Sequence, residues 1–94
     1  MADTITDNTA ASRFELALEG GPAFVTYRRA GALLVLTHAE VPQRLEGRGV
    51  GTRLVRGALE LIRARGETFV PRCPFIARYV ERHPEYRDLV AHQA

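Results

Sequence analysis

The chain has 94 residues, enough for one small domain with a single hydrophobic core. Its composition, 46% apolar and 26% charged residues, is typical of a water-soluble globular protein, and no apolar run approaches the roughly 18 residues that a membrane-spanning helix requires. The single cysteine, Cys73, excludes a disulfide within the chain and a zinc site built from several cysteines.

Charge and histidine content restrict the possible partners further. The net charge is only +2 and the aromatic content only 7%, and both count against a nucleic-acid-binding protein. All thirteen basic residues are arginine, however, and six of them lie between residues 44 and 65. The three histidines show no paired spacing, so the sequence predicts no metal site.

The first twelve residues have neither a basic segment nor an apolar segment of the kind found in secretory signals. We expect residues 1–12 to be a disordered polar leader and residues 13–94 to form the single domain. A cytoplasmic location is expected for the same reason.

Three segments in the first half of the domain have the patterns of strands. Residues 13–20 alternate polar and apolar side chains, and residues 23–29 are rich in residues that favour extended backbone. Residues 32–41 contain a nearly continuous apolar run, which suits a central strand covered on both faces. Tight turns separate the three, and Pro42 ends the last. The sequence therefore predicts an antiparallel meander.

The second half is predicted to be mainly helical. Apolar residues recur at helical spacing from about Gly49 to Arg65, and Gly66 suits a left-handed helix end. Residues 67–71 predict a short strand. A second helix is expected over residues 74–83, with Pro74 in its first turn.

The stretch "EGRGVG", Glu46 to Gly51, joins the third strand to the first helix. Glycines at the start of a helix let an anion approach the unpaired N–H groups, so this stretch is a candidate pyrophosphate site. Alternatively, the glycines form only a sharp turn and a close helix contact. A P-loop is excluded because the chain has no lysine, and a Rossmann fingerprint would need glycine at Thr52 after a parallel βαβ unit.

The strand "LLVLTHAEV", the segment "EGRGVGTRLVRGALELIRARG" and the segment "CPFIARYVERHPEY" together resemble the GNAT superfamily of N-acetyltransferases, in particular its small stand-alone members. The resemblance covers roughly residues 13–90. It implies a compact α/β GNAT-like fold without the usual N-terminal helices, acetyl-CoA or CoA as ligand, and an amine acceptor on a small molecule or an exposed protein side chain. A monomer or weak dimer is expected.

The resemblance also implies site residues. The pyrophosphate would rest on the backbone of residues 48–52, and Glu46 would point away from it, pairing with Arg44 or Arg48. The residues expected to bind CoA are Ala39, Val41, Arg44, Gly47, Arg48, Gly49, Val50, Gly51, Thr52, Arg53, Cys73 and Phe75.

Four residues are candidates for catalysis. His38 or Glu40 would accept the proton of the amine, unless the two are simply a polar rim of the sheet. The resemblance suggests that Tyr79 protonates the departing thiolate. Cys73 has three possible roles: it takes the acetyl group itself, helped by a helix dipole that favours the thiolate, it only lines the acetyl site, or it is a buried structural thiol. A non-catalytic CoA-binding module and a nucleic-acid binder that uses the arginine-rich helix remain as alternatives.

Overall fold

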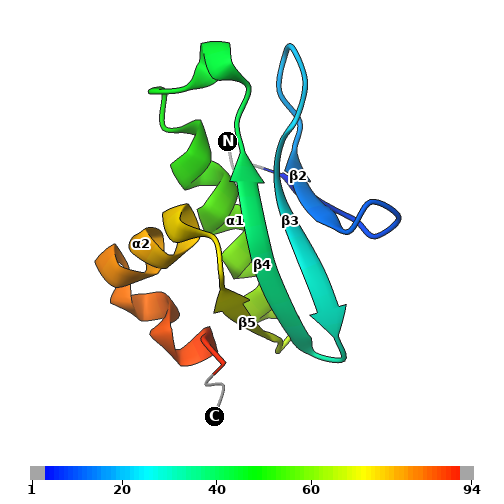
Figure 1. The fold of residues 1–94 in the computed structure, drawn as a ribbon, viewed down its shortest axis with the longest axis vertical. Helices are drawn as coiled ribbons and strands as arrows, with labels where there is room; N and C mark the ends of the chain where they lie inside the picture. The colour runs from blue at the N-terminus through cyan, green and yellow to red at the C-terminus, as the bar shows by residue number, and fades with distance from the viewer. Residues whose placement is uncertain (1–3, 92–94) are drawn as a thin grey trace.

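The computed structural model describes residues 4–91 and contains one five-stranded sheet (Figure 1). The strands lie side by side in the order of the sequence, from β1 to β5. The first four pair antiparallel, whereas β5 lies parallel to β4 because helix α1 connects the two. The strands are β1 (Ile5–Asn8), β2 (Arg13–Leu16), β3 (Ala23–Ala30), β4 (Leu33–Glu40) and β5 (Thr68–Pro71).

Two α-helices and two 3-10 helices complete the fold: η1 (Gln43–Leu45), α1 (Val50–Ala64), α2 (Pro74–Arg82) and η2 (Pro84–Leu89). Helix α1 ends as predicted, because Gly66 has φ +68° and its N–H donates to Arg63 O at 3.0 Å while Glu67 N–H donates to Ile62 O at 3.1 Å. The predicted compact α/β fold, a meander followed by a helix, a strand and a helix, is confirmed.

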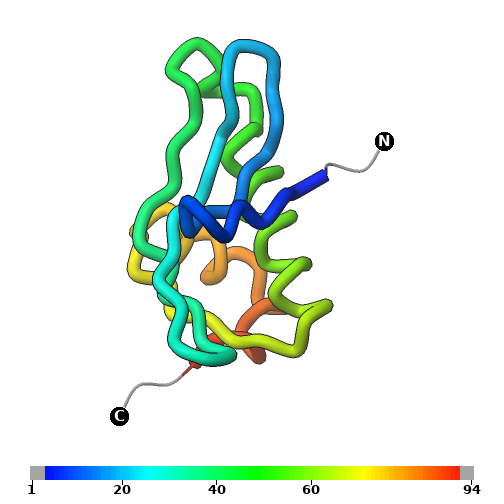
Figure 2. The backbone as a smooth tube through the Cα atoms, turned by 90° about the vertical axis from the view of Figure 1, so that its right-hand side faces the viewer, coloured from blue at the N-terminus to red at the C-terminus, as the bar shows by residue number. Residues whose placement is uncertain are grey.

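The core lies between one face of the sheet and the helices. Helix α1 packs against this face, and α2 contacts β4, β5 and α1 (Figures 1 and 2). No described strand residue that points to the opposite face is buried. The expectation that the third strand is covered on both faces is therefore wrong: Leu34 and Leu36 are fully buried, but Leu33 and Val35 remain partly exposed.

A β-bulge interrupts the pairing of β3 with β4. Thr26 pairs with His38 and Tyr27 with Leu36, so Thr37 is the extra residue on β4. The hydroxyl oxygens of Thr26 and Thr37 lie 2.8 Å apart across the bulge. Because one residue is inserted, Ala39 rather than His38 continues the face that carries Leu36. The bulge thus separates the apolar end of β4 from its polar side chains.

The expectation of a disordered leader over residues 1–12 is wrong for residues 5–8, which form β1 and pair with β2 along its whole length. The carboxylate of Asp7 accepts hydrogen bonds from the Tyr27 hydroxyl at 2.5 Å and from Arg65 Nη1 at 2.7 Å. Residues 1–3 of that segment lie outside the described residues. In the part of the chain that the structure describes, no helix has the length and apolar character needed to cross a bilayer.

Candidate functional site

The chain between β4 and α1 turns sharply at two glycines. Gly47 and Gly49 have φ values of +81° and +74°. This left-handed conformation costs other residues about 1 to 2 kcal/mol. A Cβ atom at either position would meet no atom within 4 Å. The backbone conformation, and not close packing, therefore requires glycine at both positions.

The first turn of α1 offers unpaired N–H donors. The first hydrogen bond of the helix runs from Arg53 N–H to Gly49 O at 3.1 Å. The N–H groups of Val50, Gly51 and Thr52 come before it, so the helix provides no carbonyl to accept from them. Together with the helix dipole, these donors make this end of α1 attractive to an anion.

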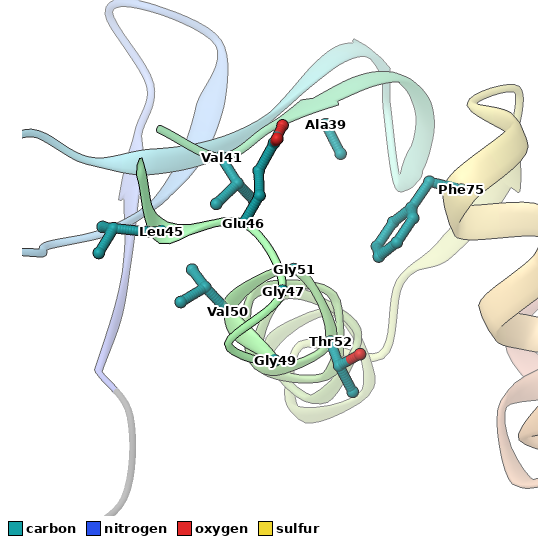
Figure 3. Close-up of a pocket in the computed structure, with 10 residues that line it drawn as sticks. All are labelled: Ala39, Val41, Leu45, Glu46, Gly47, Gly49, Val50, Gly51, Thr52 and Phe75. Carbon is teal, nitrogen blue, oxygen red and sulfur yellow. The ribbon is translucent and has the colours of Figure 1, made fainter. Parts of the chain in front are cut away.

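A cavity of about 410 Å³ lies between this helix end and the end of β4 (Figure 3). One side is formed by the glycine turn and the first turn of α1, with Gly47, Gly49, Gly51 and Thr52. The other side is apolar. It is formed by Ala39, Val41, Leu45, Val50 and Phe75.

Phe75, from the first turn of α2, forms one wall of the cavity (Figure 3). A Cβ atom built on Gly51 would lie only 2.9 Å from Cζ of its ring. Gly51 is therefore a packing glycine, unlike Gly47 and Gly49. With 44% of its surface exposed, Phe75 is the only exposed large apolar side chain in residues 4–91. An apolar ligand in the cavity would cover it.

Arg44, Arg48 and Arg53, three of the residues expected to bind CoA, do not line this cavity. A Cβ atom on Gly20 would lie 1.7 Å from Nη2 of Arg44, so this guanidinium packs on the β2–β3 turn. Arg53 lines a separate hollow between α1 and β1, and Arg48 is exposed. Glu46 lines the cavity, and its carboxylate points away from the start of α1 and toward the end of β4, the direction expected of it (Figure 3). Within residues 4–91 it forms no ion pair with Arg44 or Arg48, so that part of the expectation is wrong.

His38 and Glu40 share the opposite face of β4, as their spacing predicted. His38 Nε2 lies 3.5 Å from Glu40 Oε1, and more than half of each side chain is exposed. The cavity residue Ala39 lies between them in sequence and points the other way. The two polar side chains therefore face solvent beside the cavity and not within it.

Comparison with known proteins agrees with this arrangement. A family profile for GCN5-related N-acetyltransferases matches residues 13–89, most of the chain. The chain belongs to the GCN5-related N-acetyltransferase family. A search of curated proteins finds no significant match. Among solved structures, the solution structure of a GCN5-like protein from Staphylococcus aureus matches with a TM-score of 0.70 and 22% identity, over 99% of this chain and 92% of that one.

Cys73 is buried in this member of the family, with 6% of its surface exposed. Its N–H donates to Leu36 O at 3.1 Å, which anchors the start of α2 to the bulged part of β4. Cys73 does not line the cavity itself. In this structure its thiol belongs to the core beneath the site.

Tyr79 is likewise almost buried. Its ring stacks on His83 with 3.9 Å between the ring centres. Burial raises the pKa of the Tyr79 hydroxyl, although the charge on Arg56 acts in the opposite direction. The hydroxyl is therefore protonated at neutral pH. Tyr79 lines a small hollow on the α2 side of the cavity, not the cavity itself.

Sequence reasoning missed several residues at the site. Leu45 and Glu46 line the cavity, but nothing in the residue pattern indicated where η1 would direct them. Arg78 and Arg82 line the small hollow with Tyr79. Their spacing of four residues places them on one side of a helix, and this pattern is the signal that could have found them.

Proposed function

We propose that this GCN5-related N-acetyltransferase binds acetyl-CoA in the cavity and transfers the acetyl group to an amine. The proposal is carried by one observation: an apolar cavity opens directly beside a glycine turn and the unpaired N–H groups that begin α1. A ligand with an anionic centre and a long, weakly polar arm fits such a site. Members of this family generally use acetyl-CoA.

The two sides of the cavity suit the two parts of CoA. The N–H groups of Val50, Gly51 and Thr52 would donate to the pyrophosphate. Ala39, Val41 and Phe75 would contact the pantetheine arm. Glu46 carries a like charge, but its carboxylate points away from the start of α1 (Figure 3), so it would not face the pyrophosphate.

Acetyl-CoA supplies a thioester carbonyl: the amine nitrogen bonds to its carbon, the C–S bond breaks, and the proton lost by nitrogen balances the one gained by sulfur. His38 and Glu40, exposed beside the cavity, would accept the proton of the amine. Tyr79 is protonated and separated from the cavity by Phe75, so it would need this ring to move before it could donate to sulfur.

Calorimetric titration with CoA and with acetyl-CoA tests the binding. We expect both to bind with similar affinity, since the acetyl group adds little to the contacts described. Transfer is then measured with a panel of small amines and with peptides that carry exposed amines. Binding without transfer to any acceptor would favour a non-catalytic CoA-binding module, and absence of binding would contradict the proposal.

Cys73 distinguishes direct transfer from covalent transfer. Because the thiol is buried and outside the cavity, we expect Cys73→Ala to bind CoA within about tenfold of wild type, 1.4 kcal/mol, and to keep measurable transfer. The intact mass of the wild type after incubation with acetyl-CoA is the second measurement. Rapid gain of one acetyl group that hydroxylamine removes and Cys73→Ala abolishes would instead establish an acetyl-cysteine.

A further inference from the structure

A second hollow, of about 140 Å³, adjoins the proposed CoA cavity and shares Thr52 and Phe75 with it. Its remaining lining comes from one side of α2 and the residue that follows it: Arg78, Tyr79, Arg82 and His83. Thr52 belongs to the first turn of α1, and its side chain points toward α2 (Figure 3). The hollow therefore lies beside the proposed pyrophosphate site, on the far side of the Phe75 ring.

The two arginines of the hollow are not held by a carboxylate. Arg29, Arg63 and Arg65, by contrast, each pair with an Asp or Glu. Within residues 4–91, neither Arg78 nor Arg82 has a hydrogen bond or an ion pair, and both are exposed. Two guanidinium groups one helical turn apart are thus free to bind an anion together.

Glu60 and Glu85 lie near the hollow, but within residues 4–91 neither forms an ion pair with Arg78 or Arg82. Glu60 accepts a hydrogen bond from the Tyr86 hydroxyl at 2.5 Å, which directs its carboxylate toward η2. Burial raises the pKa of the Tyr79 hydroxyl, the charge on Arg56 lowers it, and the charges on Glu85 and Glu60 raise it, so groups of both signs lie near the hollow. Tyr79 and His83 both line the hollow: their rings stack, and Nδ1 of His83 lies 2.8 Å from the carbonyl oxygen of Tyr79.

We propose that this hollow is a phosphate-binding subsite and that it holds the 3′-phosphate of CoA. The inference rests on the proposed function, because it takes the pyrophosphate to lie at the start of α1. CoA carries a second phosphate on its ribose, and guanidinium groups bind phosphate through paired, charge-assisted hydrogen bonds. Arg78 and Arg82, not Arg44 or Arg53, are then the residues that distinguish CoA from dephospho-CoA.

Calorimetry with CoA and dephospho-CoA tests the assignment on the wild type, Arg78→Gln and Arg82→Gln. We expect the wild type to bind CoA at least about tenfold more tightly than dephospho-CoA. Each variant should lose most of this preference while its affinity for dephospho-CoA stays the same. The preference of the wild type should also decrease as salt is added, because both partners are solvent-exposed.

Arg28→Gln is the matched control. Arg28 is exposed on β3, where the alternation of the strand places it on the face opposite the helices. This variant removes the same charge and should keep the full preference for CoA. Thermal unfolding of all three variants checks that each is folded.

The two proposals fail in different ways. If the wild type binds CoA and dephospho-CoA equally, the subsite is wrong and the proposed function stands. If Arg78→Gln and Arg82→Gln lower the affinities for CoA and dephospho-CoA to the same extent, the arginines contact another part of CoA. The assignment to the 3′-phosphate is then wrong. If the wild type binds neither ligand, both proposals are wrong.

Discussion

Gly49 and Gly66 lie at the two ends of α1 with almost the same backbone conformation. Their φ values are +74° and +68°, and a Cβ atom at either would meet nothing within 4 Å. They differ in their surroundings, since only Gly49 lines the cavity. The pair therefore separates the backbone strain of a substitution from its effect on the site.

We predict that Gly49→Val abolishes CoA binding and that Gly66→Val does not. Each substitution forces an L-residue into the left-handed region and should lower the free energy of unfolding by at least about 1 to 2 kcal/mol. Only in Gly49→Val does the new side chain stand where the pyrophosphate would meet the N–H groups of α1. Urea unfolding and calorimetry with CoA measure the two effects, and a folded Gly49→Val that binds CoA normally would place the site elsewhere.

The conformation of a residue could be predicted where local sequence determines it, and not where contacts with distant residues do. The glycine turn was predictable, because three glycines at alternate positions before a helix indicate a sharp turn or a close approach to the backbone. The directions in which the side chains of Arg44 and Arg53 point could not be predicted. The first packs on Gly20 of a distant turn, and the second lies on the side of α1 that faces β1, a strand that the residue pattern does not indicate.

Helices and strands with a regular apolar pattern could be predicted from the sequence. The helix over Val50–Ala64 and the strand over Thr68–Pro71 were found within a residue or two, since each has a regular apolar pattern. β1, with the sequence ITDN, has no such pattern. The bulge at Thr37 was also missed, because it depends on the pairing of β3 with β4 and not on β4 alone.

Besides its pairing with β2 and the packing of Ile5 on the core, β1 is held by side-chain contacts of Asp7. The Asp7 carboxylate joins β1 to β3 through Tyr27 and to the end of α1 through Arg65, with only 5% of the Asp7 side chain exposed. Asp88, in η2, also pairs with an arginine, but 63% of its side chain is exposed. A charged group shielded from water contributes much more through such contacts than an exposed one.

We therefore predict that Asp7→Ala lowers the free energy of unfolding by about 1.5 to 3 kcal/mol, the range for hydrogen bonds to a charged group. Asp88→Ala should have little effect. Urea unfolding measures both changes. Equal effects of the two substitutions would show that the contacts of Asp7 contribute no more than an exposed ion pair.

The residues that line the cavity are continuous with the hydrophobic core of the whole molecule. One cluster of buried side chains joins the sheet, both α-helices and η2, and the cavity residues Ala39, Val41 and Leu45 pack against it. A chain of 94 residues with one core is expected to unfold in a single transition. A ligand in the cavity should consequently stabilise the entire fold, and not one segment of it.

At a CoA concentration one hundred times the dissociation constant, binding to the folded state alone contributes about 2.7 kcal/mol, which should raise the Tm of a domain of this size by about 10 to 20 °C. Gly49→Val should start from a lower Tm and show almost no rise. Asp7→Ala should also start lower, yet it should show nearly the full rise, because Asp7 does not line the cavity. Thermal unfolding followed by circular dichroism measures all three proteins, and a rise in Gly49→Val equal to that of the wild type would mean that CoA stabilises the fold from a different site.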